Sequence, residues 1–556
     1  MVAKTDKEQL KAYKKAKRCY TAADYRGAQT ALELLIEAEK KTAITPYALF
    51  YYALAAYHQG AQELAEGTFS RIIQEFSAWE QLNEVLYWLS QLRFEQADYV
   101  PALNYLAQIT DISWKKSIRN IKVHFLQQIE QISTLQVLLR QYPKDKTIAQ
   151  VLLDRLSEQP FIKQDHDLIT TLVQRFNLAF RAHDPFDSIL SSKKDSYNVA
   201  VFFPFFIDEV DYEEENSNQF VLELYKGIQA AVAALASQGI TVNLFAYDTK
   251  KNATITAALL AQEEVKSMDL IIGPLYAATI PLVADFAREH QINLFNPLSV
   301  NANVVGTNPF VYLFKPSLET QARRAAVFTQ QHTQTAHVGI VYGTSPEDSI
   351  KAYTYKQYIE HNTSQDVALM LQLKPEASQQ FLSAFRGVGS VHVAKPHLDS
   401  LTHIYIASQD KLIIANVLST IEIMNLNPCI IGDEAWLKQN SITLDQLQRL
   451  QLRLVAPDYI DYEKESLYAF RRAFYGQFGH YPTYYAAVGY DMMLFLGTML
   501  AQHGAYFQKC WEKKPTQGAI FSGFAYGRHH DNQHVPIVKF QESALVVCNE
   551  AQSDGQ

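Results

Sequence analysis

The clearest pattern of hydrophobic and polar positions lies between residues 198 and 316, where short apolar runs alternate with longer amphipathic stretches. In the first amphipathic stretch, apolar residues recur at three- and four-residue steps, as one buried helix face requires: Phe220, Leu224, Ile228, Val232 and Leu235. Short apolar strands separated by helices predict βαβ units on a parallel sheet, which binds ligands at the carboxyl ends of its strands. The predicted strands are 199–204, 242–245, 269–272 and 292–295.

A second strand–helix series begins at 337–342 and continues through strands at 402–407 and 428–431. From about Leu454 the chain is expected to return to the first series through residues 459–478 and a helix at 484–500. The segments that follow alternate or are rich in β-favouring residues, namely 518–526, 535–540 and 544–547. The chain therefore predicts two parallel sheets with helices between their strands.

Several short sequence words occur in a characteristic order over about residues 197 to 548: VAVFFPF, YKGIQAA, YDT, DLIIGPL, INLFNPLS and AAVGYDMMLFLG. In this order they resemble the type I periplasmic binding protein fold, the family of the branched-chain amino-acid receptors such as the leucine-binding proteins. The resemblance implies an α/β module of two lobes joined by a hinge. Lobe one would comprise residues 198–316 plus 454–517, and lobe two would comprise 317–453 plus 518–548, ending in a hairpin.

Residues 5–110 contain a repeat with a period of 37 residues. Equivalent positions hold aromatic residues, then alanine, then larger apolar residues: Tyr13, Phe50 and Tyr87; Tyr20, Tyr57 and Phe94; Ala28, Ala65 and Ala102; Leu32, Phe69 and Leu106; Leu35, Ile72 and Ile109. This spacing predicts pairs of antiparallel helices whose close contact requires the alanine. The pattern resembles tetratricopeptide repeats, and we expect an all-α solenoid over residues 5–180 that becomes degenerate after residue 110.

The polar, proline-containing segment 181–197 predicts a linker between the two parts. A solenoid of this kind would offer a concave surface to a protein or peptide partner. A rigid spacer, or a shield packed on the neighbouring domain, is the alternative interpretation.

The family resemblance implies a ligand site in the cleft between the lobes. In lobe one, turns after two strands would hold a ligand carboxylate through backbone N–H groups at helix starts; they contain Tyr276, Ala277, Thr279, Asn296, Leu298 and Ser299. In lobe two, the corresponding strand ends would contribute Tyr342, Thr344, Ser408, Asp433 and Glu434, with the two carboxylates as partners for an ammonium group. Trp436 would supply an apolar or cation–π wall.

The sequence also departs from the family pattern at this site. Bulky Leu275 and Tyr276 stand where amino-acid receptors usually have small hydroxyl residues, and Ala277 cannot donate a side-chain hydrogen bond. A fold that has lost its ligand is therefore the alternative to a ligand-binding cleft.

No catalytic motif, metal-ligand spacing or cofactor fingerprint occurs in the sequence, so we expect no catalytic residues, no metal and no cofactor. Three histidines lie close together in Arg528 to His534, in a predicted hairpin loop, where a polar turn is the simpler interpretation. The net charge of −8 disfavours nucleic acid as a partner, and no apolar run is expected to span a membrane. The residues from Met1 onward lack the apolar core of a secretory signal.

The leading hypothesis is a non-enzymatic, periplasmic or otherwise extracytoplasmic solute-binding protein, whose signal peptide has been removed. Its cleft would close on a small polar ligand, an amino acid or short peptide, and its repeats would bind a protein or peptide. The same order of repeats and module resembles the outer-membrane lipoprotein activators of penicillin-binding proteins. That resemblance gives an alternative, a regulator of peptidoglycan synthesis that acts by protein contact with an empty cleft. A cytoplasmic scaffold with peptide-binding repeats is a third interpretation.

Overall fold

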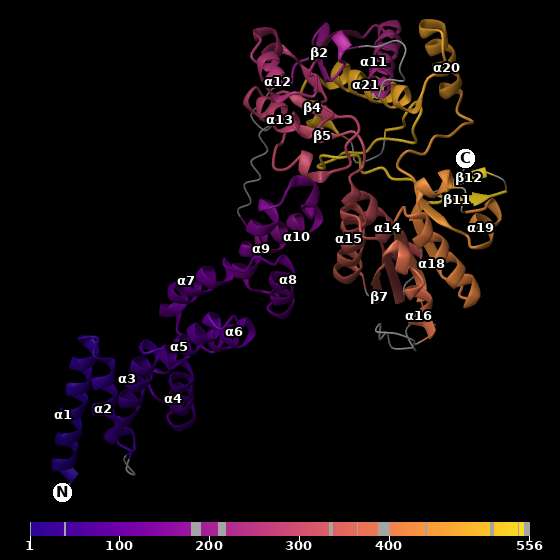
Figure 1. Cartoon of the computed structure of the whole chain (residues 1–556). Helices are drawn as coiled ribbons and strands as arrows, with labels where there is room; N and C mark the ends of the chain where they lie inside the picture. Colours follow the sequence, from indigo (N-terminus) through magenta and orange to yellow (C-terminus); the bar gives the residue numbers. More distant parts are fainter. Residues whose placement is uncertain are drawn as a thin grey trace. The chain divides into compact units, whose positions relative to one another are not determined.

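The computed structural model describes residues 2–37, 41–178, 191–209, 218–332, 337–363, 365–386, 401–439, 442–511, 516–542 and 544–549. The chain divides into two compact units (Figure 1). The helical unit comprises residues 1–158 and 167–180, and the two-lobed unit comprises 159–166 and 181–556. Residues 181–190 of the expected linker lie outside the described residues.

The helical unit is built from helices that pack mainly as consecutive pairs, namely α1–α2, α3–α4, α5–α6 and α8–α9, whereas α7 packs on α5 and α9. The helices are α1 (Val2–Thr21), α2 (Tyr25–Ile36), α3 (Thr45–His58), α4 (Gln62–Glu75), α5 (Leu82–Glu95), α6 (Tyr99–Ala107), α7 (Lys115–Leu126), α8 (Ile132–Gln141), α9 (Lys146–Glu158) and α10 (His166–Phe176).

The repeat positions coincide with the closest packing in this unit. Ala28, Ala65 and Ala102, on α2, α4 and α6, are completely buried. The turns before α2 and α6 contain Ala23 and Ala97 in the left-handed region, with φ of 60° and 57°. The first and third repeats therefore share one turn geometry, whereas membership of the tetratricopeptide family stays a prediction.

The first lobe contains a parallel five-stranded sheet in the order β2-β1-β3-β4-β5. Its strands are β1 (Ser196–Phe203), β2 (Thr241–Asp248), β3 (Leu270–Ile272), β4 (Asn293–Asn296) and β5 (Val311–Leu313). Helices cover both faces of the sheet, and β1 is therefore buried on both sides. Val199 and Val201 face one core, and Ala200 and Phe202 face the other. The covering helices are α11 (Gln219–Ser237), α12 (Ala253–Leu260), α13 (Ile280–Glu289), α20 (Glu465–Phe478) and α21 (Tyr484–His503).

Helix α11 is long and apolar enough to cross a membrane by length and composition, which the sequence analysis did not expect. It packs instead along α21 in the core of the first lobe, with Val221, Leu224, Ile228 and Leu235 buried. An apolar helix of this length is thus explained by burial on several sides within the protein.

The second lobe contains a seven-stranded sheet in the order β12-β11-β10-β9-β8-β6-β7. Five strands run parallel, and β11 and β12 form an antiparallel hairpin at one edge. The strands are β6 (His337–Tyr342), β7 (Asp366–Gln372), β8 (Leu401–Ala407), β9 (Cys429–Asp433), β10 (Arg453–Val455), β11 (Ile537–Gln541) and β12 (Ala544–Val547). The helices are α14 (Leu318–His332), α15 (Pro346–Asn362), α16 (Gln380–Arg386), α18 (Lys411–Ile423) and α19 (Leu444–Arg449). The mixed α/β fold with two mainly parallel sheets is the predicted class.

The chain passes between the lobes at different residues from those expected. Leu454 belongs to β10 of the second sheet, because this short strand pairs in parallel with β9. Residues 518–526 were expected in lobe two, but Ile520, Phe521 and Phe524 lie in the core of the first lobe against α21. Their apolar side chains complete that core, so the last passage into the second lobe falls between Tyr526 and Val535.

Candidate functional site

The first-lobe strand ends are stabilised by their own side chains. Asn296, at the end of β4, is buried, and its amide donates to the Pro274 carbonyl at 2.6 Å. Its Oδ1 accepts the N–H groups of Leu298 at 3.2 Å and Ser299 at 2.8 Å, and Ser299 Oγ accepts the N–H of Asn301. The N–H groups of Leu298 and Ser299, in one of the two turns predicted to hold a ligand carboxylate, are therefore already bonded to Asn296.

The turn after β3 is closed in the same way. Thr279 is buried, and both its hydroxyl and its N–H donate to the Tyr276 carbonyl at 3.0 Å. The Tyr276 ring lies under the Lys251 ammonium, at 4.2 Å from the ring centroid. Ala277 is exposed. The hydrogen bonds between Thr279 and the Tyr276 carbonyl therefore stabilise the turn itself.

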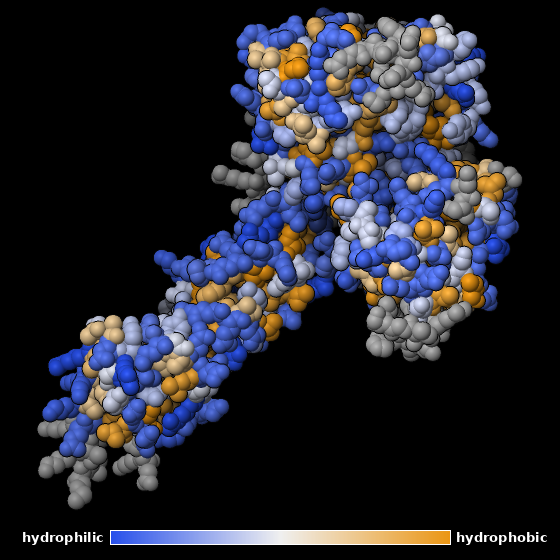
Figure 2. Space-filling view, viewed as in Figure 1, coloured by the Kyte–Doolittle hydropathy of each residue, from blue (hydrophilic) through white to orange (hydrophobic). Residues whose placement is uncertain are grey.

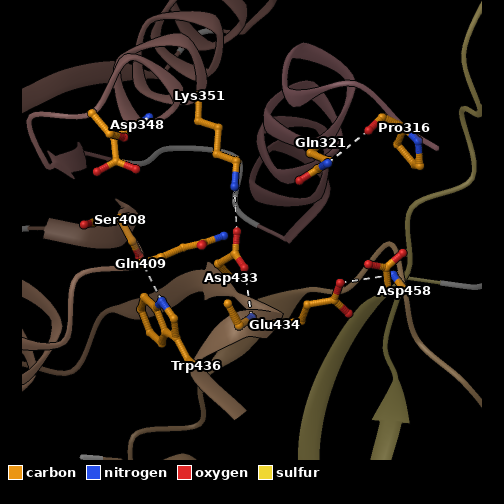
Figure 3. Close-up of polar contacts among 12 residues, drawn as sticks. Pro316, Gln321, Asp348, Lys351, Ser408, Gln409, Asp433, Glu434, Trp436 and Asp458 are labelled. Atoms are coloured by element: carbon orange, nitrogen blue, oxygen red, sulfur yellow. Dashed lines mark hydrogen bonds and ion pairs between the residues drawn. The ribbon is translucent and has the colours of Figure 1, made fainter. Parts of the chain in front are cut away.

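In the second lobe, Asp433 at the end of β9 forms an ion pair with a lysine that the sequence analysis did not identify (Figure 3). Lys351 Nζ, from α15, lies 2.6 Å from Asp433 Oδ2, and both side chains are largely buried. The other oxygen, Oδ1, accepts the N–H of Ala435 at 2.9 Å and so caps a short helical turn. The chain therefore supplies an ammonium group where the prediction placed that of a ligand.

Glu434 points away from this pair, toward the segment that leaves β10 (Figure 3). Its Oε1 accepts the N–H of Asp458 at 3.1 Å, and the Asp458 carboxylate pairs with Lys315 Nζ at 2.9 Å. Burial, together with the negative charges of Asp458 and Asp433, raises the pKa of Glu434 to about 8. At neutral pH Glu434 is mainly protonated and is a poor partner for a ligand ammonium.

Trp436 is part of the second-lobe core and does not form a wall of the cleft. It is 1% exposed, and its Nε1 donates to the Ser408 carbonyl at 2.9 Å (Figure 3). A Cβ atom at Gly432 would come within 2.3 Å of the indole ring, so glycine is needed at that position. The prediction of Trp436 as an apolar or cation–π wall of the ligand site does not fit this position, because the ring fills the core beneath β9.

The remaining second-lobe positions differ in exposure. Ser408 is buried, and its Oγ accepts the N–H of Asp410 at 3.2 Å. Tyr342 is buried at the end of β6, beside Tyr353, and desolvation and that neighbour raise its pKa to about 12. Thr344 is exposed. The structure therefore joins Ser408 and Trp436 by a hydrogen bond, whereas the Thr344 side chain is exposed to solvent.

A small cavity within the second lobe lies beside Asp433 and Lys351. It has a volume of about 10 Å³ and is also lined by Gln321, Tyr405 and Gly432. That space holds at most about one water molecule, whereas small-molecule sites are typically about 300–1,000 Å³. The ends of β8 and β9 are therefore closely packed around the pair of Lys351 with Asp433.

The histidines of Arg528 to His534 lie in the last passage between the lobes rather than in an exposed hairpin turn. His530 is buried and stacks between Phe161 and Tyr312, with ring centroids at 4.4 Å and 4.6 Å. Its Nδ1 lies 2.9 Å from the Val311 carbonyl, and burial lowers its pKa to about 4. The expectation of a polar turn is wrong, because this segment closes the edge of the first sheet.

Taken together, the fold and the strand ends define a two-lobed α/β module preceded by a helical unit. No family model and no curated protein matches the sequence. Solved structures of solute-binding proteins resemble the module. An ABC transporter substrate-binding protein from Desulfitobacterium hafniense in complex with leucine is 16% identical, with 64% of this chain and 100% of that chain covered and a TM-score of 0.41.

Two further structures show the same kind of likeness. An ABC-type branched-chain amino acid transporter protein from Rhodopseudomonas palustris is 12% identical over 63% of this chain and 95% of that chain, with a TM-score of 0.44. A branched-chain amino acid substrate-binding protein from Streptococcus pneumoniae, bound to isoleucine, is 12% identical over 63% and 97%, with a TM-score of 0.38. These are similarities of chain arrangement, and they assign no ligand to this chain.

Proposed function

We propose that the chain is a non-enzymatic, extracytoplasmic regulator of peptidoglycan synthesis that works by protein contact. The helical unit and the two-lobed module are both binding surfaces in this proposal, and the interlobe cleft holds no amino acid. The order of the two parts, which resembles the lipoprotein activators of penicillin-binding proteins, supports the choice of pathway. The pairing of polar groups with one another at the strand ends argues against capture of an amino acid.

One observation carries this proposal, namely that Lys351 pairs with Asp433, the carboxylate predicted to hold a ligand ammonium. An amino acid could bind Asp433 only after displacing Lys351 from a largely buried pair. Breaking such a pair by removing one partner costs about 3–5 kcal/mol, and the displaced lysine would also need a new partner. In the first lobe, the N–H groups of Leu298 and Ser299 are bonded to Asn296, so a ligand carboxylate would have to displace Asn296 to reach them.

The proposal is tested with the full-length protein and a purified bifunctional penicillin-binding protein of the same organism. We expect direct binding in biolayer interferometry and a changed rate of glycan polymerisation or cross-linking. A parallel thermal-shift panel of leucine, isoleucine, benzoate and short peptides is expected to leave the melting temperature unchanged. Absence of any synthase contact, by binding and by rate, would refute the regulatory function.

A solute receptor is the second candidate, and it is favoured by the exposed positions Ala277 and Thr344 at strand ends of the two lobes. A ligand without an ammonium group would not compete with Lys351. Such a ligand at a hundredfold excess over its dissociation constant stabilises the protein by about 2.7 kcal/mol. A clear rise in melting temperature with one member of the panel, benzoate included, would establish this candidate instead.

A further inference from the structure

Helix α20 has one buried and one exposed face, and the exposed face is rich in tyrosine and arginine. Leu467, Phe470 and Phe474 are buried in the core of the first lobe. On the opposite side, Tyr468 and Tyr475 are 52% and 50% exposed. Figure 1 shows α20 at the outer edge of this lobe. The core uses only one side of the helix, so the tyrosines on the other side are not required for packing.

Two arginines and a third tyrosine extend this surface. Arg471 and Arg472 follow Tyr468 at three and four residues, and Tyr475 follows at seven, so these residues share one side of the helix. Tyr481, which is 65% exposed, folds back beside them. Its ring centroid lies 5.1 Å from that of Tyr475 and 5.4 Å from the Arg471 guanidinium carbon. We call these five residues the arginine–tyrosine face.

The charges of this face are available to a partner. Among the residues that the structure describes, neither Arg471 nor Arg472 forms an ion pair. From Ser466 to Tyr490 the sequence has these two arginines and no acidic residue, in a chain with a net charge of −8. Glu465 lies in the first turn of the helix, three residues before Tyr468, so the positive charge of the face is confined to Arg471 and Arg472.

The side-chain chemistry is that of a protein interface. Tyrosine and arginine are enriched among the residues that contribute most binding energy, because they offer large contact areas together with hydrogen-bond donors. The hydropathy colouring in Figure 2 does not mark α20 as an apolar patch, since tyrosine and arginine are not apolar on that scale. The contacts of Tyr481 with Tyr475 and Arg471 also order the side chains before binding, which reduces the entropic cost.

We infer that the arginine–tyrosine face is the surface on which the two-lobed unit docks an acidic face of a partner protein. This inference rests on the proposed function and names the contact by which it would operate. Carboxylates of the partner would pair with Arg471 and Arg472, and its apolar or amide groups would pack on the tyrosine rings. The partner is a protein with an acidic patch, not a nucleic acid or a second copy of the chain.

The test uses the full-length protein and the purified bifunctional penicillin-binding protein of the same organism. We expect Tyr468→Ser combined with Tyr475→Ser to weaken binding about tenfold or more, as loss of interface anchors does. Arg472→Glu should lower the association rate and reduce its dependence on salt, while Arg472→Lys retains most of both. The matched control is Ile423→Ser with Leu444→Ser, which changes two residues of the second lobe that are 62% and 63% exposed.

The outcomes separate this inference from the proposed function. If the unmodified chain does not bind the synthase, the proposed function fails and this docking assignment fails with it. If it binds and the tyrosine variant binds equally well, with an unchanged melting temperature, the assignment alone is overturned. If sedimentation shows that the unmodified chain dimerises and the tyrosine variant is a monomer, the face joins two copies and the acidic partner is refuted.

Discussion

Asp433 and Glu434 are adjacent in sequence but lie in different environments. Asp433 pairs with Lys351 and caps the turn that follows, whereas Glu434 turns toward the Asp458 N–H. The side chain of Glu434 has no cation in direct contact among the ion pairs of the described residues, and the nearby lysine, Lys315, is paired with Asp458. Of the two adjacent carboxylates, only Asp433 is therefore in direct contact with a cation among the described residues.

Replacement of Lys351 tests the ion pair directly. We expect Lys351→Met to lower the free energy of unfolding by about 3–5 kcal/mol, because it leaves Asp433 buried without a cation. Adding Asp433→Asn should restore part of that loss. Urea denaturation of the single and double variants measures both effects. Additive losses in the double variant would show that the two side chains do not interact.

Glu434 predicts a specific dependence of stability on pH. Its pKa is raised from 4.5 to about 8, so between these values the folded state retains a proton that the unfolded state has released. The contribution of Glu434 is therefore present below pH 4.5 and is lost as the pH rises toward 8. We expect Glu434→Gln to gain stability relative to the parent across this range. Denaturation of the parent and the variant from pH 5 to 8 measures this difference.

At this scale the sequence could locate strand ends but not the contacts of their side chains. The resemblance placed Asp433 and Ser299 at turns after strands, where the structure also has them. It could not show Lys351, because that residue lies on a helix far away in sequence and meets Asp433 only when α15 packs on the sheet. Trp436 was misplaced for a similar reason, since the sequence does not show that Gly432 leaves room for a buried indole.

The close contact of α11 with α21 depends on two glycines. A Cβ atom at Gly227 would lie 2.0 Å from the Ala486 carbonyl oxygen, and one at Gly489 would lie 2.1 Å from the Leu224 carbonyl oxygen. Both obstacles are backbone atoms, which cannot move aside as a side-chain end could. The two helices are therefore closer together than any side chain at these positions would allow.

Alanine substitution separates this packing effect from helix propensity. We expect Gly227→Ala or Gly489→Ala to destabilise the two-lobed unit by about 3 kcal/mol, as overpacking does. Gly476→Ala on the exposed side of α20 is the control, because nothing lies within 4 Å of its added methyl group. That change should stabilise by about 0.5–1 kcal/mol through helix propensity. Thermal denaturation of the three variants gives the comparison, and a neutral Gly227→Ala would contradict the close contact.

Elements with strong periodicity could be predicted, and short ones could not. Helix α11 and strands β1, β6 and β8 follow their hydrophobic patterns closely. Strand β7 was missed because it lies at a sheet edge and alternates weakly, and three-residue β5 is too short to give a periodic signal. The strand β10 was assigned to the wrong lobe, since a three-residue strand shows which sheet it joins only through its neighbours.

At the scale of the whole molecule, residues 159–166 belong to the two-lobed unit although helices of the other unit flank them. Ile162 is completely buried in the first lobe, and Phe161 stacks on His530. Arg323 donates to the Ile162 carbonyl at 3.1 Å, and the Phe161 N–H donates to the Gly306 carbonyl at 2.9 Å. The sequence predicted one linker at 181–197 and gave no signal for this earlier crossing, because the segment is short and its apolar residues have no period.

Truncating Ile162 is expected to affect the two-lobed unit. Ile162→Ala should lower the stability of that unit by about 2–5 kcal/mol, because it leaves a cavity in the first-lobe core. Ile112→Ala, at a helical-unit position that is 74% exposed, should change little. Hydrogen exchange resolved by peptide follows each unit separately. Faster exchange confined to α1–α9 in Ile162→Ala would contradict the placement of this residue.

The pairing of α11 with α21 has a consequence for the order in which the protein is made. The ribosome completes β1 to β5 by residue 313, but the helix that covers α11 is not finished until residue 503. Contacts between residues this far apart in sequence form late. An apolar helix whose packing partner has not yet been synthesised is prone to aggregation. The nascent first lobe must therefore be shielded, by a chaperone or by its own collapse, while nearly two hundred further residues are translated.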